Sequence, residues 1–184
     1  MNFYDVINKR SSERSFKDTP ICEKKMGRIM EATMKSPSWK NQSSYKIILV
    51  NEKSEKDKLA GAVMNDGNNG ENALREAPMV AVVVGNPNVS GKIGDKEYYL
   101  VDGAIAMEHL ILAATNEGYG TCWIGAIDEA TVKSTLNIPD EYKVIGVTPI
   151  GEVNKHEAQD SNTHMSDHVF INKWENKFNK DKLN

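Results

Sequence analysis

The chain has few cysteines, no excess of either charge and no long uninterrupted apolar run, and each shortage excludes a class of protein. Its two cysteines, Cys22 and Cys122, cannot form a disulfide framework, and their spacing is not that of metal ligands. The net charge of -3 and the pI near 5.8 argue against non-specific nucleic-acid binding, which needs a basic face. The longest apolar stretch contains Asp102, Glu108 and Glu117, so it does not predict a membrane span.

Several familiar motifs are also missing. The sequence contains no glycine-rich phosphate loop of the Rossmann or Walker type and no G-x-S-x-G nucleophile elbow. The N-terminus has no charged-then-apolar leader, so we expect a cytoplasmic, reducing location. A length of 184 residues is that of one domain.

The stretch 101–127 is the feature around which the rest of the chain is organised. Its first part is apolar on nearly every helical face, which predicts a helix buried in a large core or between subunits. Gly118 predicts the end of this helix, because glycine adopts the left-handed backbone at low cost. Residues 120–126 predict an apolar strand with a glycine at its end, where a flat ligand could lie against the backbone.

Helical and strand patterns alternate along the chain, which predicts a layered α/β or α+β domain. The expected helices begin at the caps Asn2, Ser54 and Asp128 or follow an apolar stripe, and they cover 2–9, 22–34, 54–63, the central stretch and 128–136. The expected strands cover 45–50, 79–85, 120–126 and 142–153. Residues 65–72 and 86–97 are expected to be a flexible turn and a loop. Residues 169–171 are expected to form a strand that pairs far away, for instance with another subunit.

Two polar segments have the chemistry of a binding site. Arg10, Ser11, Ser12 and Arg14 combine two forked cations with two hydroxyl groups, which suits a phosphate, although a solvated polar loop has the same composition. The segment 36–44 offers the amide of an asparagine, which can read the edge of a heterocycle, or it is an ordinary turn with a tryptophan packed on the core. Taken alone, each segment favours the ordinary loop or turn over the binding site.

Three further features are weighed in the same way. Gly125 permits close approach of a ligand to the backbone, or it only ends a strand. Cys122 has no local histidine or aspartate to form a thiolate, so we interpret it as a small buried apolar residue. His164 and His168 have the spacing of metal ligands on a helix, but this segment is not a convincing helix, and zinc is only an alternative hypothesis.

Taken in order, these segments resemble the nitroreductase family of flavoproteins. The resemblance covers about residues 2–153. The family patterns are R-R-S-x-R-x-F, A/S-P-S-x-x-N, Ala-Pro before a valine-rich strand, and a long helix followed by a strand. They correspond here to 9–16, 36–41, 77–78, 102–104 and 118–125.

The resemblance implies a fold, an assembly and an activity. The fold is α+β and nitroreductase-like, with a central, mainly antiparallel sheet flanked by helices, in an intertwined homodimer. Residues 1–184 would form one domain, with 154–184 as an extension that embraces the partner. The activity is reduction of nitroaromatic or quinone-like acceptors by NAD(P)H through FMN, in ping-pong two-electron transfer. The alternative is an FMN-binding storage or sensing protein without significant turnover. No nucleic acid, membrane or metal is expected.

The resemblance also implies roles for individual residues. Arg10, Ser11 and Ser12 would hold the FMN phosphate and ribityl chain. Arg14 would face the N1–C2=O edge of the ring, where a fixed cation stabilises the negative charge of the reduced flavin, and no residue is needed as an acid or base catalyst. The residues expected beside the ring are Pro37, Ser38, Trp39 and Asn41 of the other subunit, and Ile124, Gly125 and Ala126.

The chain departs from the family pattern at three places. The glutamine that usually follows the asparagine motif is displaced, since the sequence continues as Gln42-Ser43-Ser44. The basic residue that often follows the last strand has only His164 or Lys155 as a substitute. The pyrimidine edge of the flavin has no clear cationic partner in 68–74, although Asn69 or Asn72 is placed to contact it.

Overall fold

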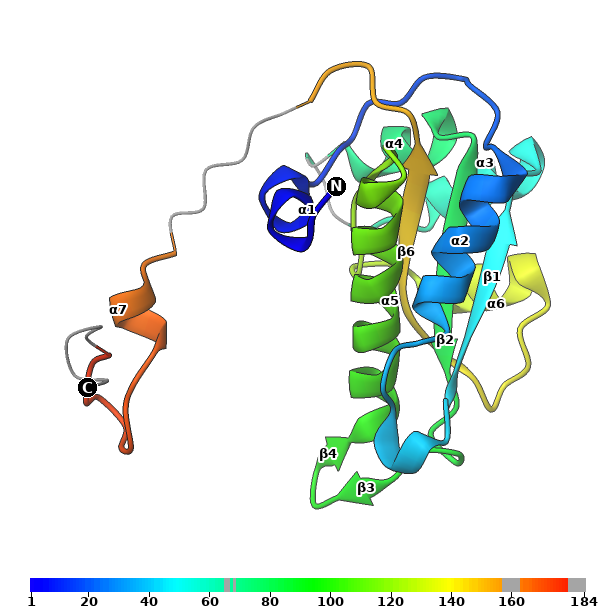
Figure 1. Cartoon of the computed structure of the whole chain (residues 1–184). Coiled ribbons are helices and arrows are strands. Elements are labelled where there is room, and N and C mark those ends of the chain that lie inside the picture. The colour runs from blue at the N-terminus through cyan, green and yellow to red at the C-terminus, as the bar shows by residue number, and fades with distance from the viewer. Residues whose placement is uncertain (65–66, 68, 157–162, 179–184) are drawn as a thin grey trace.

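The computed structural model describes residues 1–64, 67, 69–156 and 163–178. A four-stranded sheet forms its centre, with the strand order β1-β2-β6-β5 and antiparallel pairing throughout (Figure 1). The strands are β1 (Tyr45–Val50), β2 (Met79–Gly85), β5 (Gly120–Thr121) and β6 (Lys143–Gly151). A small hairpin pairs β3 (Lys92–Ile93) with β4 (Lys96–Glu97). The expected α+β architecture with a mainly antiparallel sheet is confirmed.

Helices cover both faces of the sheet. α2 (Glu23–Thr33) and α5 (Tyr98–Asn116) pack on one face, with α1 (Phe3–Lys9) beside α5 (Figure 1). α3 (Lys53–Gly61), α4 (Gly70–Glu76) and α6 (Glu129–Leu136) cover the other face. The valines of β2 are buried on both sides, which explains why this strand is an unbroken apolar run.

The central helix α5 is not covered on all sides by its own chain. Its inner face packs on the sheet through side chains such as Met107 and Leu110, which are fully buried. Near its start, Leu100 and Val101 are 45% and 40% exposed. Ile105, at helical spacing from Val101, is only half-buried. The burial of α5 is therefore incomplete within one chain, and one apolar stripe remains available for burial between subunits, the second of the two expected surroundings.

Two helix predictions need correction. Residues 70–76 form α4, whereas the sequence predicted a flexible turn over 65–72; residues 65, 66 and 68 of that turn lie outside the described residues. Polar and glycine residues concealed this helix, whose start packs against Ile124 through Gly70. Ser54 is not the cap of α3, because that helix begins one residue earlier after Glu52. The caps predicted at Asn2 and Asp128 are confirmed.

The strand expected over 120–126 is shorter and interrupted. β5 ends at Thr121, and the backbone N–H of Cys122 then donates to the side-chain oxygen of Thr148, 3.1 Å away, instead of to a strand. Pairing with β6 resumes at Ile124, which exchanges two 2.9 Å backbone hydrogen bonds with Val147. The apolar pattern therefore predicts the burial of 120–122 and Ile124, but Trp123 and Gly125 are exposed and the strand is interrupted, which the pattern does not predict.

The C-terminal residues 163–178 form a small unit that lies apart from the sheet in Figure 1. It contains the short helix α7 (Met165–His168), and Phe170 makes a ring contact with Trp174 at a centroid distance of 5.0 Å. Phe170 pairs with Lys177 in a single bridge, so the prediction of a strand over 169–171 with a distant partner is wrong. None of the helices in the described part of the chain is long and apolar enough to cross a membrane.

Candidate functional site

Residues 10–14, here called the clamp, are fastened to the edge of the sheet by backbone pairing. Ser12 forms a parallel bridge with Thr121 of β5, and the N–H of Glu13 donates to the carbonyl of Thr121 at 2.8 Å. Two residues beyond the clamp, Phe16 forms an antiparallel bridge with Val153, just after β6. The clamp therefore takes its position from the sheet.

Gly120 permits this close approach of the clamp to β5. A Cβ atom at this position would lie 2.3 Å from a methyl carbon of Val153 and 2.9 Å from the Cβ of Glu13. Such distances are shorter than any ordinary contact, so only glycine fits here without movement of the backbone. Gly120 is thus required by close packing, whereas Gly118, with a φ of 86°, is favoured by its backbone conformation.

Three of the predicted phosphate and ring contacts gather around the buried thiol of Cys122. Burial raises the pKa of this thiol, while the charge of Arg14, a hydrogen bond with Ser12 and the charge of Arg10 act in the opposite direction. The guanidinium of Arg14 also donates to the carbonyl of Ser12 at 3.3 Å. Cys122 is buried as predicted, and the raised pKa keeps it a protonated, inert thiol.

Glu13 of the clamp pairs with His156, a contact that the sequence did not predict. Glu13 is 2% exposed, and its Oε1 accepts from the hydroxyl of Ser11 at 2.6 Å and from Nδ1 of His156 at 2.9 Å. His156 is thus a basic residue that follows the last strand and contacts the clamp through Glu13. A signal was available, because Glu13 is the only acid in the segment 10–16.

Residues 124–126 follow β5 in the chain and contact the region where α4 begins. The carbonyl of Ala126 accepts from the N–H of Met64 at 2.9 Å. Ile124 packs against Gly70, because a Cβ atom added at Gly70 would lie 3.3 Å from the Cδ1 atom of Ile124. Asn69, in the left-handed conformation, directly precedes α4. Gly125 is exposed beside these residues, so its backbone is accessible.

The second predicted segment lies in a strained turn that contains the short helix η1 (Trp39–Asn41). Lys40, Asn41 and Ser43 all have positive φ angles, of 47°, 59° and 47°. The hydroxyl oxygen of Ser38 accepts from the N–H of Ser43 at 2.9 Å. Non-glycine residues adopt this conformation only where their surroundings hold them, and such strain is concentrated at binding sites.

Asp102 of α5 holds this turn in place. Its carboxylate is 1% exposed and accepts from the N–H of Trp39 at 2.7 Å, from the hydroxyl of Ser44 at 2.6 Å and from the hydroxyl of Ser90 at 3.1 Å. The sequence marked Asp102 as part of a motif and as an interruption of the apolar helix, but it did not predict this role.

The indole ring of Trp39 packs on its own chain. It stacks on Tyr98, with ring centroids 4.0 Å apart and planes inclined by 33°. It also covers Gly91, where a Cβ atom would lie 2.3 Å from the indole nitrogen. This packing fixes the direction of the turn that carries Pro37, Ser38 and Asn41.

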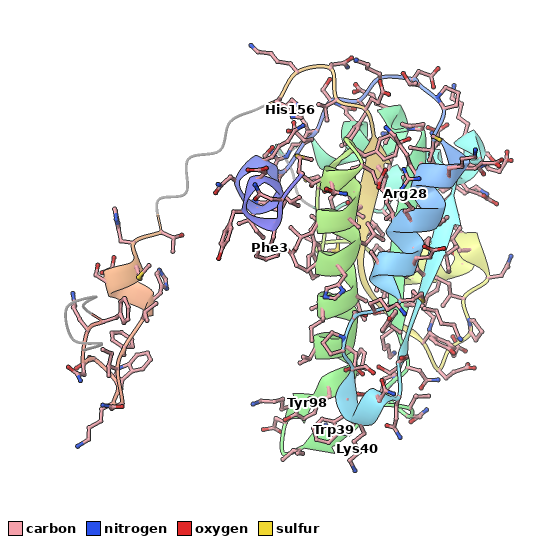
Figure 2. All side chains as sticks on the ribbon, in the orientation of Figure 1. Phe3, Arg28, Trp39, Lys40, Tyr98 and His156 are labelled. Carbon is pink, nitrogen blue, oxygen red and sulfur yellow. The ribbon has the colours of Figure 1, made fainter. Side chains whose placement is uncertain are left out.

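The two segments lie at opposite ends of α5. Trp39 and Tyr98 are at the end where α5 begins, whereas His156, which contacts the clamp, is at the end where α5 finishes (Figure 2). The 19 residues of α5 make it about 28 Å long at 1.5 Å per residue. One chain therefore places the clamp against Thr121 and Cys122, just before 124–126 in the chain, but it does not bring the turn 37–41 to the clamp.

The structure is thus a three-layer α+β domain with an arginine-serine clamp at the sheet edge and a strained turn at the far end of its longest helix. The model of the nitroreductase family matches residues 7–152. The chain belongs to this family, as its motifs predicted.

Known proteins agree with this assignment over most of the chain. It is 42% identical to a nitroreductase family protein from Clostridium novyi NT, with a TM-score of 0.83 and 97% of each chain covered. It is 24% identical to an NADPH-dependent oxidoreductase from Staphylococcus aureus, covering 97% of this chain and 75% of that protein. The structure of an FMN-dependent nitroreductase from Clostridium difficile R20291 superimposes with a TM-score of 0.81 at 22% identity, covering 94% of this chain and all of that one, which shows a shared fold.

The alternative of a metal site finds no support around His164 and His168. These residues lie at the cap and the last position of the four-residue helix α7. Within the described part of the chain, no three histidine, cysteine or carboxylate side chains are grouped closely enough to hold a metal ion.

Proposed function

We propose that the chain is an FMN-dependent oxidoreductase that uses NAD(P)H to reduce nitroaromatic or quinone-like acceptors in a ping-pong cycle. The observation that carries the proposal is the clamp, which presents Arg10, Ser12 and Arg14 around Cys122, three residues before the exposed Gly125. The FMN group, when bound, would supply the redox chemistry, taking hydride from NAD(P)H and passing it to the second substrate.

The donors of the clamp fit the two ends of this group. Arg10 and Ser12 offer a charged fork and a hydroxyl to a phosphate and ribityl chain, and charge-assisted hydrogen bonds are the strongest available to a protein. Arg14, fixed by the carbonyl of Ser12, holds a permanent positive charge where a reduced ring would carry negative charge. Ile124, Gly125 and Ala126 would lie along the ring.

The separation of the two segments supports a shared site in a homodimer. The turn with Pro37, Ser38, Trp39 and Asn41 lies about 28 Å along α5 from the clamp, too far to contact the same ligand from one chain. A second chain in the opposite orientation would bring its turn to the clamp of the first. The exposed apolar stripe of α5 that contains Val101 would then be the interface between the two chains.

The C-terminal unit fits the same assembly. Residues 154–184 are proposed to be the extension of the single domain that embraces the partner, since Trp174 is 81% exposed and Met165 is 53% exposed in one chain. Large apolar side chains at such exposure are typical of an interaction surface.

Two similar proteins support the choice of electron donor and cofactor. The Staphylococcus aureus relative is named an NADPH-dependent oxidoreductase, and the Clostridium difficile structure, similar in fold, is named an FMN-dependent nitroreductase. These names favour a nicotinamide as donor and FMN as the group held by the clamp.

Anaerobic titration of the purified protein tests the proposal. The protein should bind one FMN per chain, and NADH or NADPH should reduce it fully, after which a nitroaromatic or a quinone should reoxidise it. A protein that ignores FMN would refute the proposal. Bound FMN that neither nicotinamide reduces would favour the storage or sensing alternative.

A further inference from the structure

A cavity lies at the end of the sheet where β1 finishes and β2 begins, and the segment that joins α1 to α2 crosses this end (Figure 1). It consists of two adjoining hollows of about 420 and 570 Å³, whose walls share Pro20, Asn51 and Pro78. Volumes of this size suit a small ligand. Among the described residues that line the two hollows, none belongs to the clamp or to 124–126, so the cavity is separate from the candidate flavin site.

The larger hollow contains a buried lysine, Lys56 of α3. Lys56 is 8% exposed, and its ammonium group donates to the carbonyl of Ala77, just after α4, at 2.6 Å. An ammonium group has three protons to donate, and within the described part of the chain Ala77 is its only hydrogen-bond acceptor. Burial lowers the pKa of Lys56, and the charge of Asp18 acts in the opposite direction. A bound anion would therefore stabilise the charged form of this lysine.

The other charged side chains of the larger hollow are either paired or exposed. Arg75 forms ion pairs with two carboxylates, and Glu76 accepts a hydrogen bond from a backbone N–H at 3.3 Å. Lys53 and Asp18 are exposed at the rim, and neither forms an ion pair with a described residue. Lys56 is therefore the buried charge of this hollow that lacks a carboxylate partner at ion-pair distance, and it favours a ligand with an anionic group.

The smaller hollow is mainly apolar. Its walls include Ile21, Met26 and Met79, and its one charged residue among those described is Glu23, which is exposed. Methionine side chains are flexible and polarizable, so they adapt to apolar ligands of different shapes. A ligand that occupies both hollows would place an apolar chain on the methionines and its anionic group at Lys56.

We propose that this cavity binds a small amphipathic carboxylate, whose carboxylate group contacts Lys56 and whose apolar chain lies on Met26 and Met79. One ammonium group matches the single charge of a carboxylate, whereas Asp18 and Glu76 would repel a dianion such as a phosphate. The cavity is thus a second small-molecule site of the chain, and this inference is independent of the proposed function.

The test is an NMR titration of the protein, labelled with ¹³C at the methionine methyl groups, with hexanoate. The signals of Met26 and Met79 should shift, whereas those of Met107, fully buried in α5, and of Met64, 68% exposed elsewhere, should not. Hexanamide lacks the charge and acetate lacks the apolar chain, so each should bind about tenfold more weakly than hexanoate. Hexanoate that leaves Met26 and Met79 unchanged, or that binds no better than hexanamide, would overturn the proposal.

Three variants locate the carboxylate group. Lys56→Gln should weaken hexanoate binding about tenfold and leave hexanamide binding unchanged. Asp18→Asn removes a competing charge from an exposed position, so it should tighten hexanoate binding without harm to the fold. Arg10→Ala should leave hexanoate binding unchanged, because the clamp lies outside the cavity.

Unchanged hexanoate binding in Lys56→Gln would overturn the proposal, as would loss of binding in Arg10→Ala, which would place the anion at the clamp. If Lys56→Gln does not fold, Asp18→Asn decides the matter, since unchanged or weaker hexanoate binding in that variant contradicts a carboxylate held at Lys56.

Discussion

The two ends of α5 carry the two halves of the candidate site, and they are held in different ways. The clamp is paired through its backbone to β5, and Gly120 allows it to lie against the sheet. The turn that contains η1 has three residues at positive φ and depends on the side chain of Asp102. The first half is therefore held by backbone pairing to the sheet, whereas the second is strained and is held by side chains, chiefly the carboxylate of Asp102 and the packed indole ring of Trp39. This difference predicts that single substitutions damage the turn more severely than the clamp.

Asp102→Ala should have the largest effect. It removes the acceptor of three hydrogen bonds and leaves the N–H of Trp39 and the hydroxyls of Ser44 and Ser90 without their partner. We expect a loss of about 3–5 kcal/mol in the free energy of unfolding, measured by urea denaturation. Asp102→Asn, which keeps the shape and one acceptor, should lose clearly less. Equal losses would show that the hydrogen bonds to the carboxylate do not hold the turn.

Gly120→Ala tests the other end and should have the next largest effect. The added Cβ would meet Val153 and Glu13, so the clamp must move, at a cost of about 1–3 kcal/mol in stability. Gly27→Ala is the matched control, since nothing lies within 4 Å of its Cβ position in α2, and it should stabilise the protein by about 1 kcal/mol. A neutral Gly120→Ala would mean that the clamp is not packed closely on β5.

Arg14→Ala should act on the flavin more than on the fold. Loss of the fixed charge should lower the two-electron reduction potential of bound FMN by about 30 mV, which corresponds to an about tenfold greater loss of affinity for the reduced form than for the oxidised form. Oxidised FMN should lose less affinity than that, and Arg14→Lys should retain most of the potential. An unchanged potential, measured by anaerobic dye titration, would remove the role assigned to Arg14.

The smallest effect concerns the thiols. Hydrogen bonds from the backbone of Lys25 and Lys24 lower the pKa of exposed Cys22, whereas burial raises the pKa of Cys122. At about pH 8, iodoacetamide should therefore label Cys22 rapidly and Cys122 slowly, because the thiolate is the reactive form. Cys122→Ala should bind FMN as the wild type does. A large loss of FMN binding would show that the thiol contributes to the site.

The sequence predicted what depends on local pattern. The apolar run 79–85, the strand 45–50 and the caps Asn2 and Asp128 appear in the structure as expected. The ordered motifs also led to the correct family. These features follow from side-chain period and turn chemistry, which neighbouring residues determine.

What the sequence did not predict depends on contacts between distant segments. α4 was missed because its polar and glycine residues become helical only where Gly70, Ala73 and Leu74 are buried. Glu13 and His156 are 143 residues apart, and Asp102 is 63 residues from Trp39, so no local pattern could pair them. The sequence offered one usable sign of these contacts. Glu13 lies in a segment with two arginines and Asp102 lies in an apolar helix, and an acid that is buried needs a partner.

The central claim is that the clamp of one chain and the turn of another form one FMN site. Co-expression of a clamp variant, Arg10→Ala/Arg14→Ala, with a turn variant, Ser38→Ala/Asn41→Ala, tests it directly through the FMN content of the purified mixed dimer. Each variant alone should retain little FMN. The mixed dimer has one site with both halves intact and should hold one FMN per two chains. A mixed dimer that holds no more FMN than either variant alone would contradict the account.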